Sequence, residues 1–268
     1  MKLSSKTFCN HNPEKFVKVY HYKTKPKYEK NYFIKGNYQR FFYTCKICGH
    51  FYAKHGFKIG KLYSKQYLNL TYKNLEGIQK RFDQIIDLPK NKSDNKNRAE
   101  RVNRFFSKDN LSLLDVGSGI GVFIFEMRKK KWDVKGVELD KRYVDFCKDK
   151  HGLNIYQKNL SKIKSKNKFD LVTLNKVLEH VSDPVDLLKL SSKFLNKKGI
   201  LYIEVPDVKA SDGGKHRQEF CIDHLHVFSK SSFKILAEKS GLKTLICKRI
   251  QEPSGKYTIY GFLKKKII

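Results

Sequence analysis

Apolar residues follow two different spacings along this chain, and its second half alternates between them. Short apolar runs such as 111–116 and 169–174 are typical of buried strands. Between the runs, apolar positions recur at helical intervals, which is typical of helices that pack on a sheet. This alternation predicts an α/β domain with a largely parallel sheet. The predicted strands are 111–116, 134–138, 154–157, 169–174, 199–205, 243–249 and 256–263, and a predicted helix, 120–131, follows the first of them.

Capping residues place the ends of the later helices. Asp140 can cap a helix after the second strand, and Asp183, which a proline follows, predicts the start of another. We expect that helix to end near 197–199. There, two lysines can interact favourably with the negative end of the helix dipole, and a glycine ends the helix. Ser229 predicts the start of a last helix, which ends at Gly241.

The chain ahead of the α/β region has two parts. Residues 1–60 are rich in Tyr, Phe, His and Cys, and alternating stretches such as 16–20 predict a small β-rich module. Residues 61–110 carry helical spacing that a polar loop at 90–97 interrupts. We therefore expect a module at 1–60, a helical connector at 61–110 and the α/β domain at 111–268.

The composition is strongly basic, with a formal net charge of +31 from 57 Lys and Arg against 26 Asp and Glu. Lysine is spread over both halves and is accompanied by asparagine, so a solvated surface explains the charge better than a nucleic-acid partner does. No run approaches the roughly 20 apolar residues that a membrane-spanning helix needs. The first residues lack the apolar segment of a secretory signal. We expect a cytoplasmic protein with no membrane span.

A glycine-rich turn, Asp-Val-Gly-Ser-Gly-Ile-Gly at 115–121, follows the first predicted strand. Glycines allow a tight turn whose backbone can lie against a ligand. Their spacing is Gly-x-Gly-x-Gly, whereas the dinucleotide fingerprint needs Gly-x-Gly-x-x-Gly and here has Val122 in the last position. Glu138 ends the second predicted strand, where a carboxylate can bind both hydroxyls of a ribose.

These elements resemble class I S-adenosylmethionine-dependent methyltransferases. The resemblance extends through Phe-Asp-Leu-Val at 169–172, Val-Leu-Glu-His-Val-Ser-Asp-Pro at 177–184 and Asp-His-Leu-His-Val-Phe-Ser at 223–229. It implies a Rossmann-like sheet of seven strands with helices on both faces, and S-adenosylmethionine as the cofactor. It also implies that Glu138 holds the ribose, that Asn159 lies near the adenine and that Asn175 lies near the sulfonium. The implied cofactor-binding residues are Asp115, Gly117, Ser118, Gly119, Gly121, Glu138, Asn159 and Asn175.

Three histidines follow the fourth and fifth predicted strands, at the edge where open α/β sheets bind ligands. A histidine can remove the proton of a hydroxyl acceptor, and His224 is our first candidate for this catalytic base, with His180 second. Alternatively, His180 only hydrogen-bonds the backbone around the following helix cap. We expect His224 and His226 to point to one side of an extended segment. Lys176 stands where metal-binding relatives have a carboxylate, which predicts a metal-independent reaction.

A possible metal site lies near the front of the chain. Cys45 and Cys48, followed by a glycine, form a knuckle that supplies two thiolates of a tetrahedral zinc site. Cys9 and His11 offer the other two ligands, and His50 competes with His11 for the fourth position. A short module has a small hydrophobic core, so a bound metal ion stabilises it strongly. Many sugar and small-molecule methyltransferases carry a similar zinc-binding segment. The alternative is three ordinary cysteines in a small core.

The expected function is methylation of a small molecule. A sugar or nucleotide-sugar of surface-polysaccharide synthesis is the favoured acceptor, and oxygen is the favoured atom. The alternative is an RNA methyltransferase that binds RNA through the zinc module and the basic surface, including the aromatic and basic stretch 38–43. A non-catalytic binding module would require damage to the glycine turn, which is intact. The sequence leaves the acceptor and the oligomeric state open.

Overall fold

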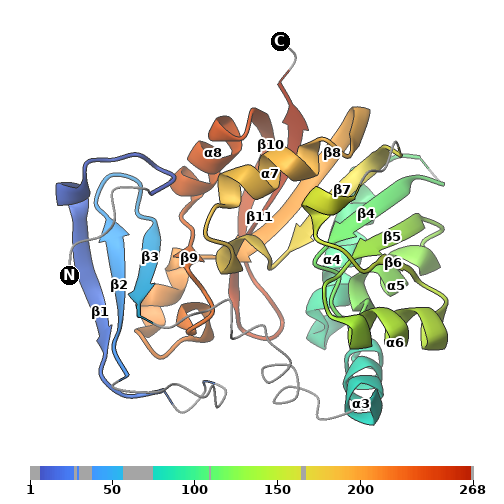
Figure 1. Ribbon diagram of the computed structural model, residues 1–268, viewed down its shortest axis with the longest axis horizontal. Helices are drawn as coiled ribbons and strands as arrows, with labels where there is room; N and C mark the ends of the chain where they lie inside the picture. The colour runs from blue at the N-terminus through green and yellow to red at the C-terminus, as the bar shows by residue number, and fades with distance from the viewer. Residues whose placement is uncertain are drawn as a thin grey trace.

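A seven-stranded sheet forms the centre of the computed structural model, which describes residues 7–26, 29, 38–56, 75–108, 110–163 and 167–266. In spatial order the strands are β10 (Leu242–Gln251), β11 (Tyr257–Lys265), β8 (Leu195–Pro206), β7 (Phe169–Asn175), β4 (Ser112–Val116), β5 (Asp133–Val137) and β6 (Asn154–Tyr156) (Figure 1). Strand β11 is antiparallel to both of its neighbours, and all the other pairs are parallel. The predicted seven-stranded α/β fold is confirmed.

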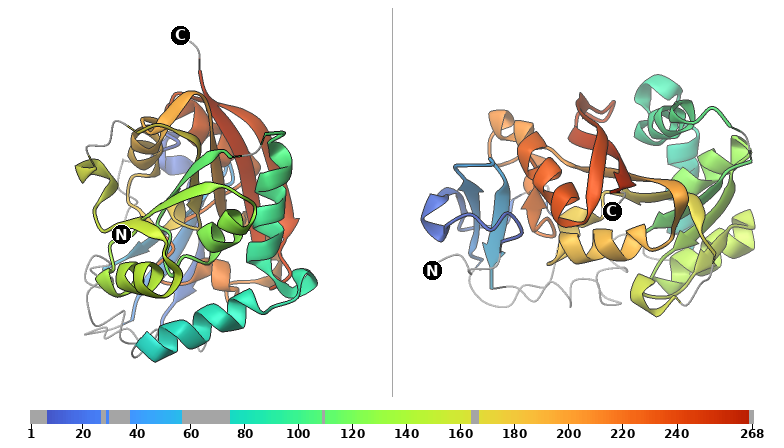
Figure 2. Two further views of the ribbon diagram at one scale, coloured as in Figure 1. Left: turned by 90° about the vertical axis from the view of Figure 1, so that its right-hand side faces the viewer. Right: turned by 90° about the horizontal axis from the view of Figure 1, so that it is seen from above.

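Helices cover both faces of this sheet (Figure 2). Residues that alternate along one strand serve different faces, since Leu113 packs with one core and Leu114 with the other. The helices of the first face are α3 (Leu75–Ile86), α4 (Asp94–Phe105), α5 (Val122–Lys129) and α6 (Lys141–His151), and those of the second are α7 (Pro184–Ser192) and α8 (Lys230–Lys239).

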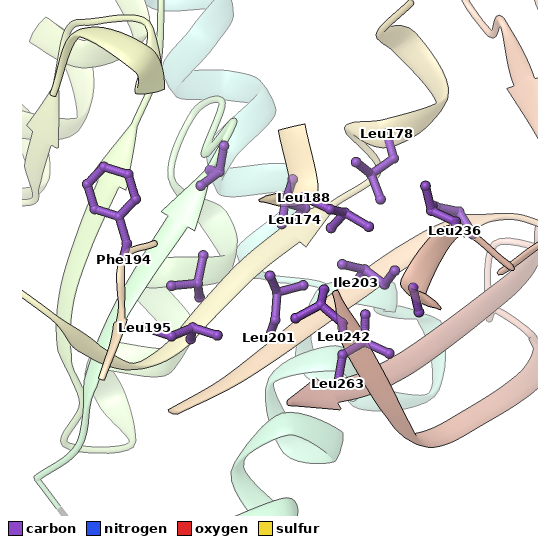
Figure 3. Packing of buried hydrophobic residues seen from close by; sticks show 14 of the residues in the cluster. Leu174, Leu178, Leu188, Phe194, Leu195, Leu201, Ile203, Leu236, Leu242 and Leu263 are labelled. Carbon is purple, nitrogen blue, oxygen red and sulfur yellow. The ribbon is translucent and has the colours of Figure 1, made fainter. Parts of the chain in front are cut away.

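The core of the second face is built from leucine and isoleucine side chains (Figure 3). Leu174 and Ile203 project from the sheet toward Leu188 of α7 and Leu236 of α8, and all four are fully buried. Burial of such side chains contributes roughly 1.5–3 kcal/mol each. This packing holds the carboxyl ends of β7 and β8 in a fixed relation to the helices that follow them.

Helix α7 is shorter than predicted. It ends at Ser192 rather than near 197–199, because the chain already enters β8 at Leu195, which pairs with Phe169. Phe194 and Leu195 are both buried in the second core. Hydrophobic burial therefore ends the helix before the lysines and the glycine do.

Two other helix starts also differ from the prediction. Helix α4 begins at Asp94, inside the predicted loop 90–97, because the Ser93 hydroxyl accepts a hydrogen bond from the Lys96 backbone. Helix α5 begins at Val122 because Gly121 adopts a left-handed conformation. The short 3₁₀ helices are Pro13–Lys15, Lys90–Lys92, Leu160–Lys162, Leu178–His180, Val208–Gly213 and Gln218–Phe220.

A smaller antiparallel sheet lies beside the large one (Figure 1). Its strands are β1 (Phe16–Tyr22), β2 (Arg40–Cys45), β3 (Phe51–His55) and β9 (His226–Val227). Strand β9 comes from the α/β region, where Val227 pairs with Phe51 of β3. The N-terminal strands and the α/β region thus share one sheet. Residues 57–74, which include the start of the predicted connector, lie outside the described residues.

Candidate active site

The carboxyl ends of β4 and β7 meet at a buried carboxylate. Asp115 accepts hydrogen bonds from the Thr173 hydroxyl at 2.6 Å and from the Asn175 amide nitrogen at 2.9 Å. Burial raises the pKa of Asp115 to about 7, although these two hydrogen bonds favour its charged form. The sequence had indicated Asp115 and Asn175, but not the Thr173 hydroxyl that joins them.

The glycine turn after β4 needs its glycines for two reasons. Gly117, Gly119 and Gly121 all have φ between +54° and +79°, the left-handed region that favours glycine. A Cβ on Gly117 would lie 2.8 Å from a methyl of Val177, and one on Gly121 would lie 2.8 Å from the Cys147 sulfur. A Cβ on Gly119 would meet no atom of the described residues within 4 Å, so among these residues the turn is open at its centre.

The residues of this turn fit a polar ligand. Glu138 Oε2 accepts a hydrogen bond from the Gly119 backbone at 2.9 Å, which places the carboxylate beside the open part of the turn. Ser118 Oγ and Asn175 Oδ1 are buried without a hydrogen-bond partner in the described part of the chain. Buried polar atoms are almost always paired, so these two point to a bound molecule. Asn159 is exposed, and its Oδ1 caps the next 3₁₀ helix by accepting from the Ser161 backbone.

A cavity of about 400 Å³ lies beyond the carboxyl ends of β7 and β8. Its lining includes Glu29 from the N-terminal region, Arg98 from α4, Lys176 and Glu179 from the loop after β7, and His224. Val177, between two of these residues, is the side chain that packs against Gly117. The glycine turn and the cavity therefore lie on either side of one short segment.

Two of the three predicted histidines line this cavity. His180 Nδ1 lies 2.9 Å from the Asp223 carbonyl, and His224 Nδ1 lies 2.9 Å from the Glu219 carbonyl. Because carbonyls only accept, both Nδ1 atoms carry a proton. Burial and the neighbouring His180 lower the pKa of His224, which keeps its imidazole neutral.

His226 does not share this position. Its Nδ1 lies 3.1 Å from His50 and its Nε2 lies 3.0 Å from the Val181 carbonyl, so it packs between the two sheets. The prediction that His224 and His226 point to one side is wrong, because a hydrogen-bonded turn from Cys221 to His224 precedes the strand. Two-residue periodicity holds only in extended chain.

Glu179 was not among the site residues predicted from the sequence. It is fully buried, and neither carboxylate oxygen has a hydrogen-bond partner among the described residues. Donor atoms of Glu179, His180 and His224 lie within 4.8 Å of one another. Lys176 adds a basic side chain to the same cavity. The cavity therefore offers a carboxylate, two imidazoles and an ammonium to a small molecule bound in it.

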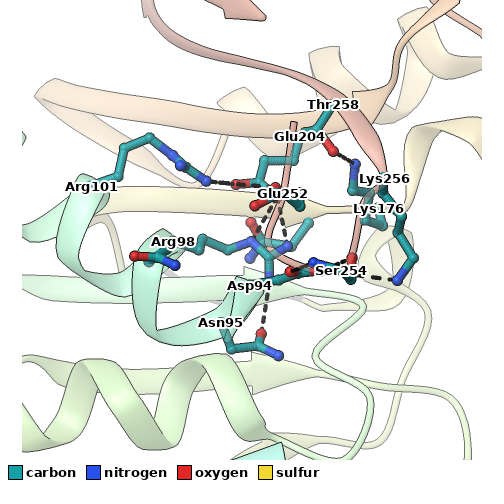
Figure 4. Close-up of polar contacts among 12 residues, drawn as sticks. Asp94, Asn95, Arg98, Arg101, Lys176, Glu204, Glu252, Ser254, Lys256 and Thr258 are labelled. Carbon is teal, nitrogen blue, oxygen red and sulfur yellow. Dashed lines mark hydrogen bonds and ion pairs between the residues drawn. The ribbon is translucent and has the colours of Figure 1, made fainter. Parts of the chain in front are cut away.

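A buried network of ion pairs supports the wall of the cavity (Figure 4). Arg98 and Arg101 of α4 both bind the fully buried Glu204, at 2.6 Å and 2.7 Å. Burial disfavours the charged form of Glu204, but the two guanidinium groups lower its pKa below the usual range. The network fixes α4 against β8, and Lys176 lies at its edge.

Comparison with known proteins identifies the family. Residues 91–246, more than half of the chain, match the family described as a methyltransferase domain. The chain belongs to the methyltransferase domain family. The matched residues include the glycine turn, the Glu-His segment and all three histidines discussed above.

Curated relatives of this methyltransferase-family chain match part of it. The ubiquinone biosynthesis O-methyltransferase of Pelagibacter ubique (strain HTCC1062) is 35% identical over 99 residues, which are 35% of this chain and 41% of that protein. The protein of the same name from Hydrogenovibrio crunogenus (strain DSM 25203 / XCL-2) is 28% identical over 113 residues, 39% of this chain and 46% of that one. The chain spans less than half the length of these relatives.

Solved methyltransferase structures share the fold. The glycopeptide N-methyltransferase MtfA, complexed with S-adenosyl-L-methionine, has a TM-score of 0.54 at 11% identity, covering 64% of this chain and 94% of that one. The plantazolicin methyltransferase BpumL, in complex with SAH, has a TM-score of 0.55 at 13% identity, covering 77% and 93%. The family match confirms the predicted methyltransferase, and these structures confirm its class I fold. The use of S-adenosylmethionine and the zinc-bearing subgroup stay predictions.

The predicted zinc ligands come together at the end of the small sheet. Donor atoms of Cys9, His11, Cys45 and Cys48 all lie within 4.8 Å of one another, and His11 Nδ1 lies 3.1 Å from the Cys45 sulfur. Both ring nitrogens of His50 have other partners: Nδ1 lies 3.1 Å from Ser232 Oγ, and Nε2 lies 3.1 Å from His226 Nδ1. Of the two histidines considered for the fourth position, His11 is therefore the one beside the three cysteines.

The aromatic and basic stretch 38–43 forms most of β2, and half of it faces the interior. Arg40 and Phe42 are fully buried, and Arg40 forms an ion pair with Glu29 and donates to the Phe220 carbonyl. Through this ion pair, Arg40 contacts a residue that lines the cavity. Because Arg40 and Phe42 are buried, they cannot stack on bases. Within the described residues, no helix is both long and apolar enough to span a bilayer.

Proposed function

We propose that this chain transfers a methyl group from S-adenosylmethionine to an oxygen atom of a small molecule. One observation carries the proposal: Val177 packs against Gly117 of the glycine turn, and its neighbours Lys176 and Glu179 line the cavity. A donor in the turn and an acceptor in the cavity would thus meet at the end of β7. Positioning of two reactants accounts for much of the rate of such a transfer.

The donor site would use the polar groups of the turn. Glu138 would accept hydrogen bonds from the ribose, and Ser118 and Asn175 would gain the partners that they lack. Asp115, Gly117, Gly119 and Gly121 would lie around the methionine part, and Asn159 near the adenine. When bound, S-adenosylmethionine supplies an electrophilic methyl group on a sulfonium.

The acceptor hydroxyl needs a base, and His224 is our choice. Its Nδ1 proton is held by the Glu219 carbonyl, so Nε2 has the free electron pair that takes a proton. The Glu179 carboxylate favours the imidazolium that forms. His180, whose ring lies 4.8 Å from that of His224, is the second candidate. No catalytic metal is required by this arrangement.

For the acceptor, the curated relatives named O-methyltransferases support oxygen as the methylated atom. A sugar or nucleotide-sugar stays our narrower proposal, supported by the polar lining of a cavity large enough for a small molecule. The RNA alternative is weaker, because the aromatic and basic stretch of β2 is half buried. We also propose a cytoplasmic location and keep the division into 1–60, 61–110 and 111–268.

Two measurements test the function. Calorimetry should detect binding of S-adenosylhomocysteine, and a labelled-methyl assay on lysate split into small-molecule, glycan and RNA fractions should label a small molecule. No binding of S-adenosylhomocysteine would refute the methyltransferase proposal. Label found only in RNA, lost at high salt, would support the alternative instead.

We further propose that Cys9, His11, Cys45 and Cys48 hold a structural zinc ion. Three thiolates and one imidazole are a common tetrahedral ligand set for zinc. Elemental analysis should find one zinc per chain, and Cys48→Ser should lose it, whereas Cys221→Ser should retain it. Metal-free protein with unchanged thermal stability would refute this proposal.

A further inference from the structure

Lys176 has an unusual position at the end of β7. Its backbone is left-handed, with φ of +58°, and its N–H donates to the Glu204 carbonyl at 3.0 Å. Residues other than glycine seldom adopt this conformation, and strained positions of this kind cluster at functional sites. Among the described residues Asn10, Asn110 and Lys131 also have positive φ, but none of them lines the cavity. The turn directs the side chain across the sheet edge, where Nζ donates to the buried Thr258 hydroxyl (Figure 4).

The Thr258 hydrogen bond uses one of three donors on the ammonium. Among the described residues, no other side chain is close enough to accept from Lys176 Nζ. Burial lowers the pKa of Lys176, although the nearby carboxylates of Glu204, Glu179 and Glu252 favour its charged form. Lys176 is only partly buried and it lines the cavity. Its remaining donors are therefore available to a molecule bound there.

Most acids of the cavity already have partners. Glu29 pairs with Arg40, Asp94 accepts from the Ser254 hydroxyl, and Glu219 accepts from the Tyr257 backbone. Glu179 is the exception, since neither of its oxygens accepts a hydrogen bond from a described residue. The loop after β7 thus presents a cation and a carboxylate, three residues apart, with hydrogen-bonding capacity that the described residues leave unfilled. Lys256 is a second cation of the lining and lies 4.0 Å from Asp94.

We propose that Lys176 is a catalytic residue that binds the acceptor oxygen as an oxyanion and makes the enzyme selective for hydroxyl over amine acceptors. This inference rests on the proposed methyl transfer. The ammonium would donate to the oxygen that is methylated, while Glu179 would accept a hydrogen bond from another polar hydrogen of the same acceptor.

The chemistry explains the selectivity. The acceptor proton goes to His224 Nε2, an oxygen electron pair forms the new O–C bond, and the electron pair of the broken C–S bond stays on sulfur. A nearby ammonium stabilises the oxyanion before transfer. Methylation of a neutral amine instead creates a positive charge on nitrogen, which the same ammonium opposes. Lys176 therefore favours oxygen and penalises nitrogen.

A chromogenic phenol can test this without turnover. The probe is 4-nitrophenol, titrated into protein saturated with S-adenosylhomocysteine, because its phenolate and phenol forms have different visible spectra. In the wild type, we expect the bound probe to ionise at a lower pH than the free probe. Lys176→Met should abolish this shift, and Lys176→Arg should keep part of it. Lys256→Met is the matched control, because it removes a cation from the rim of the same cavity.

The outcomes separate the two proposals. If S-adenosylhomocysteine fails to bind the wild type, the methyltransferase proposal fails. If it binds equally to the wild type and to Lys176→Met, but the probe does not bind, or ionises alike in both, then the role of Lys176 is refuted. On the acceptor found by the labelled-methyl assay, Lys176→Met should lower kcat by about 10²- to 10³-fold, as loss of one oxyanion donor does. An unchanged kcat, or an amine as the methylated group, would also refute it.

Discussion

His50 Nε2 lies 3.1 Å from His226 Nδ1, in the interior where the small sheet meets the large one. The direction of this contact follows from its far end, where His226 Nε2 donates to the Val181 carbonyl at 3.0 Å. His226 Nδ1 must then accept the proton of His50 Nε2. Both imidazoles are neutral in this chain of hydrogen bonds, and a proton added to His226 would break it.

Acid should therefore destabilise the protein through His226. Burial lowers the pKa of His226 to about 4 in the folded protein, whereas an unfolded histidine has a pKa of about 6.5. The unfolded state takes up the proton first, so stability is full above pH ~6.5 and falls as the pH decreases toward ~4, by about 2–3 kcal/mol for this group. Urea unfolding at both pH values should show a smaller loss in His226→Gln. Equal losses in the two proteins would contradict the prediction.

Loss of the Glu138 carboxylate should weaken cofactor binding. The carboxylate lies beside Gly119, and hydrogen bonds to a charged group contribute about 1.5–3 kcal/mol. We expect Glu138→Ala to raise the Kd for S-adenosylhomocysteine by about 10- to 100-fold in calorimetry. Asp149→Asn, an exposed acid of α6, is the control and should bind normally. Normal binding by Glu138→Ala would exclude its contact with the ribose.

His224 should be needed for turnover but not for cofactor binding. We expect His224→Gln to lower kcat by about 10²- to 10⁴-fold, the usual contribution of a general base. Because the pKa of His224 is lowered, wild-type activity should persist to a lower pH than an ordinary histidine allows. His216→Gln, an exposed histidine of the same segment, should be fully active. If only His180→Gln loses activity, the base is His180.

The buried carboxylate of Glu204 should matter for stability. It neutralises Arg98 and Arg101, and removal of one member of a buried ion pair costs about 3–5 kcal/mol. We expect Glu204→Gln to lose this amount in urea unfolding. Glu100→Gln removes the half-buried partner of two surface cations, Arg104 and Lys130, and should cost less than the Glu204 variant, about 1 kcal/mol. Similar losses in the two variants would show that the buried network contributes little.

Local patterns were sufficient to predict the strands and the glycine turn. Apolar runs, helix caps and glycine spacing depend on neighbouring residues, so the prediction placed Asp115, Gly119 and Glu138 at one edge of the sheet. The start of α4 could also have been predicted from the sequence, because Ser93 is a typical helix cap. It lies inside a polar stretch that the prediction assigned to a loop. The early end of α7 required knowledge of which residues pair with Phe169.

The cavity could not be predicted in the same way. Glu29 and Arg98 come from distant parts of the chain, and only the folded arrangement brings them to the loop after β7. The different surroundings of His224 and His226 also depend on a long-range contact, the pairing of β9 with β3. Sequence spacing could not distinguish His11 from His50 either, because the choice depends on the tertiary contact between His50 and His226.

The pairing of β3 with β9 also constrains the order in which the protein can fold. Strand β3 leaves the ribosome long before the residues of β9, so its edge has no native partner while most of the α/β region is being synthesised. Unpaired edges favour association with other chains, and contacts between distant residues form slowly. We therefore expect the smaller sheet to be completed last, and the nascent chain to depend on chaperones until Val227 reaches Phe51.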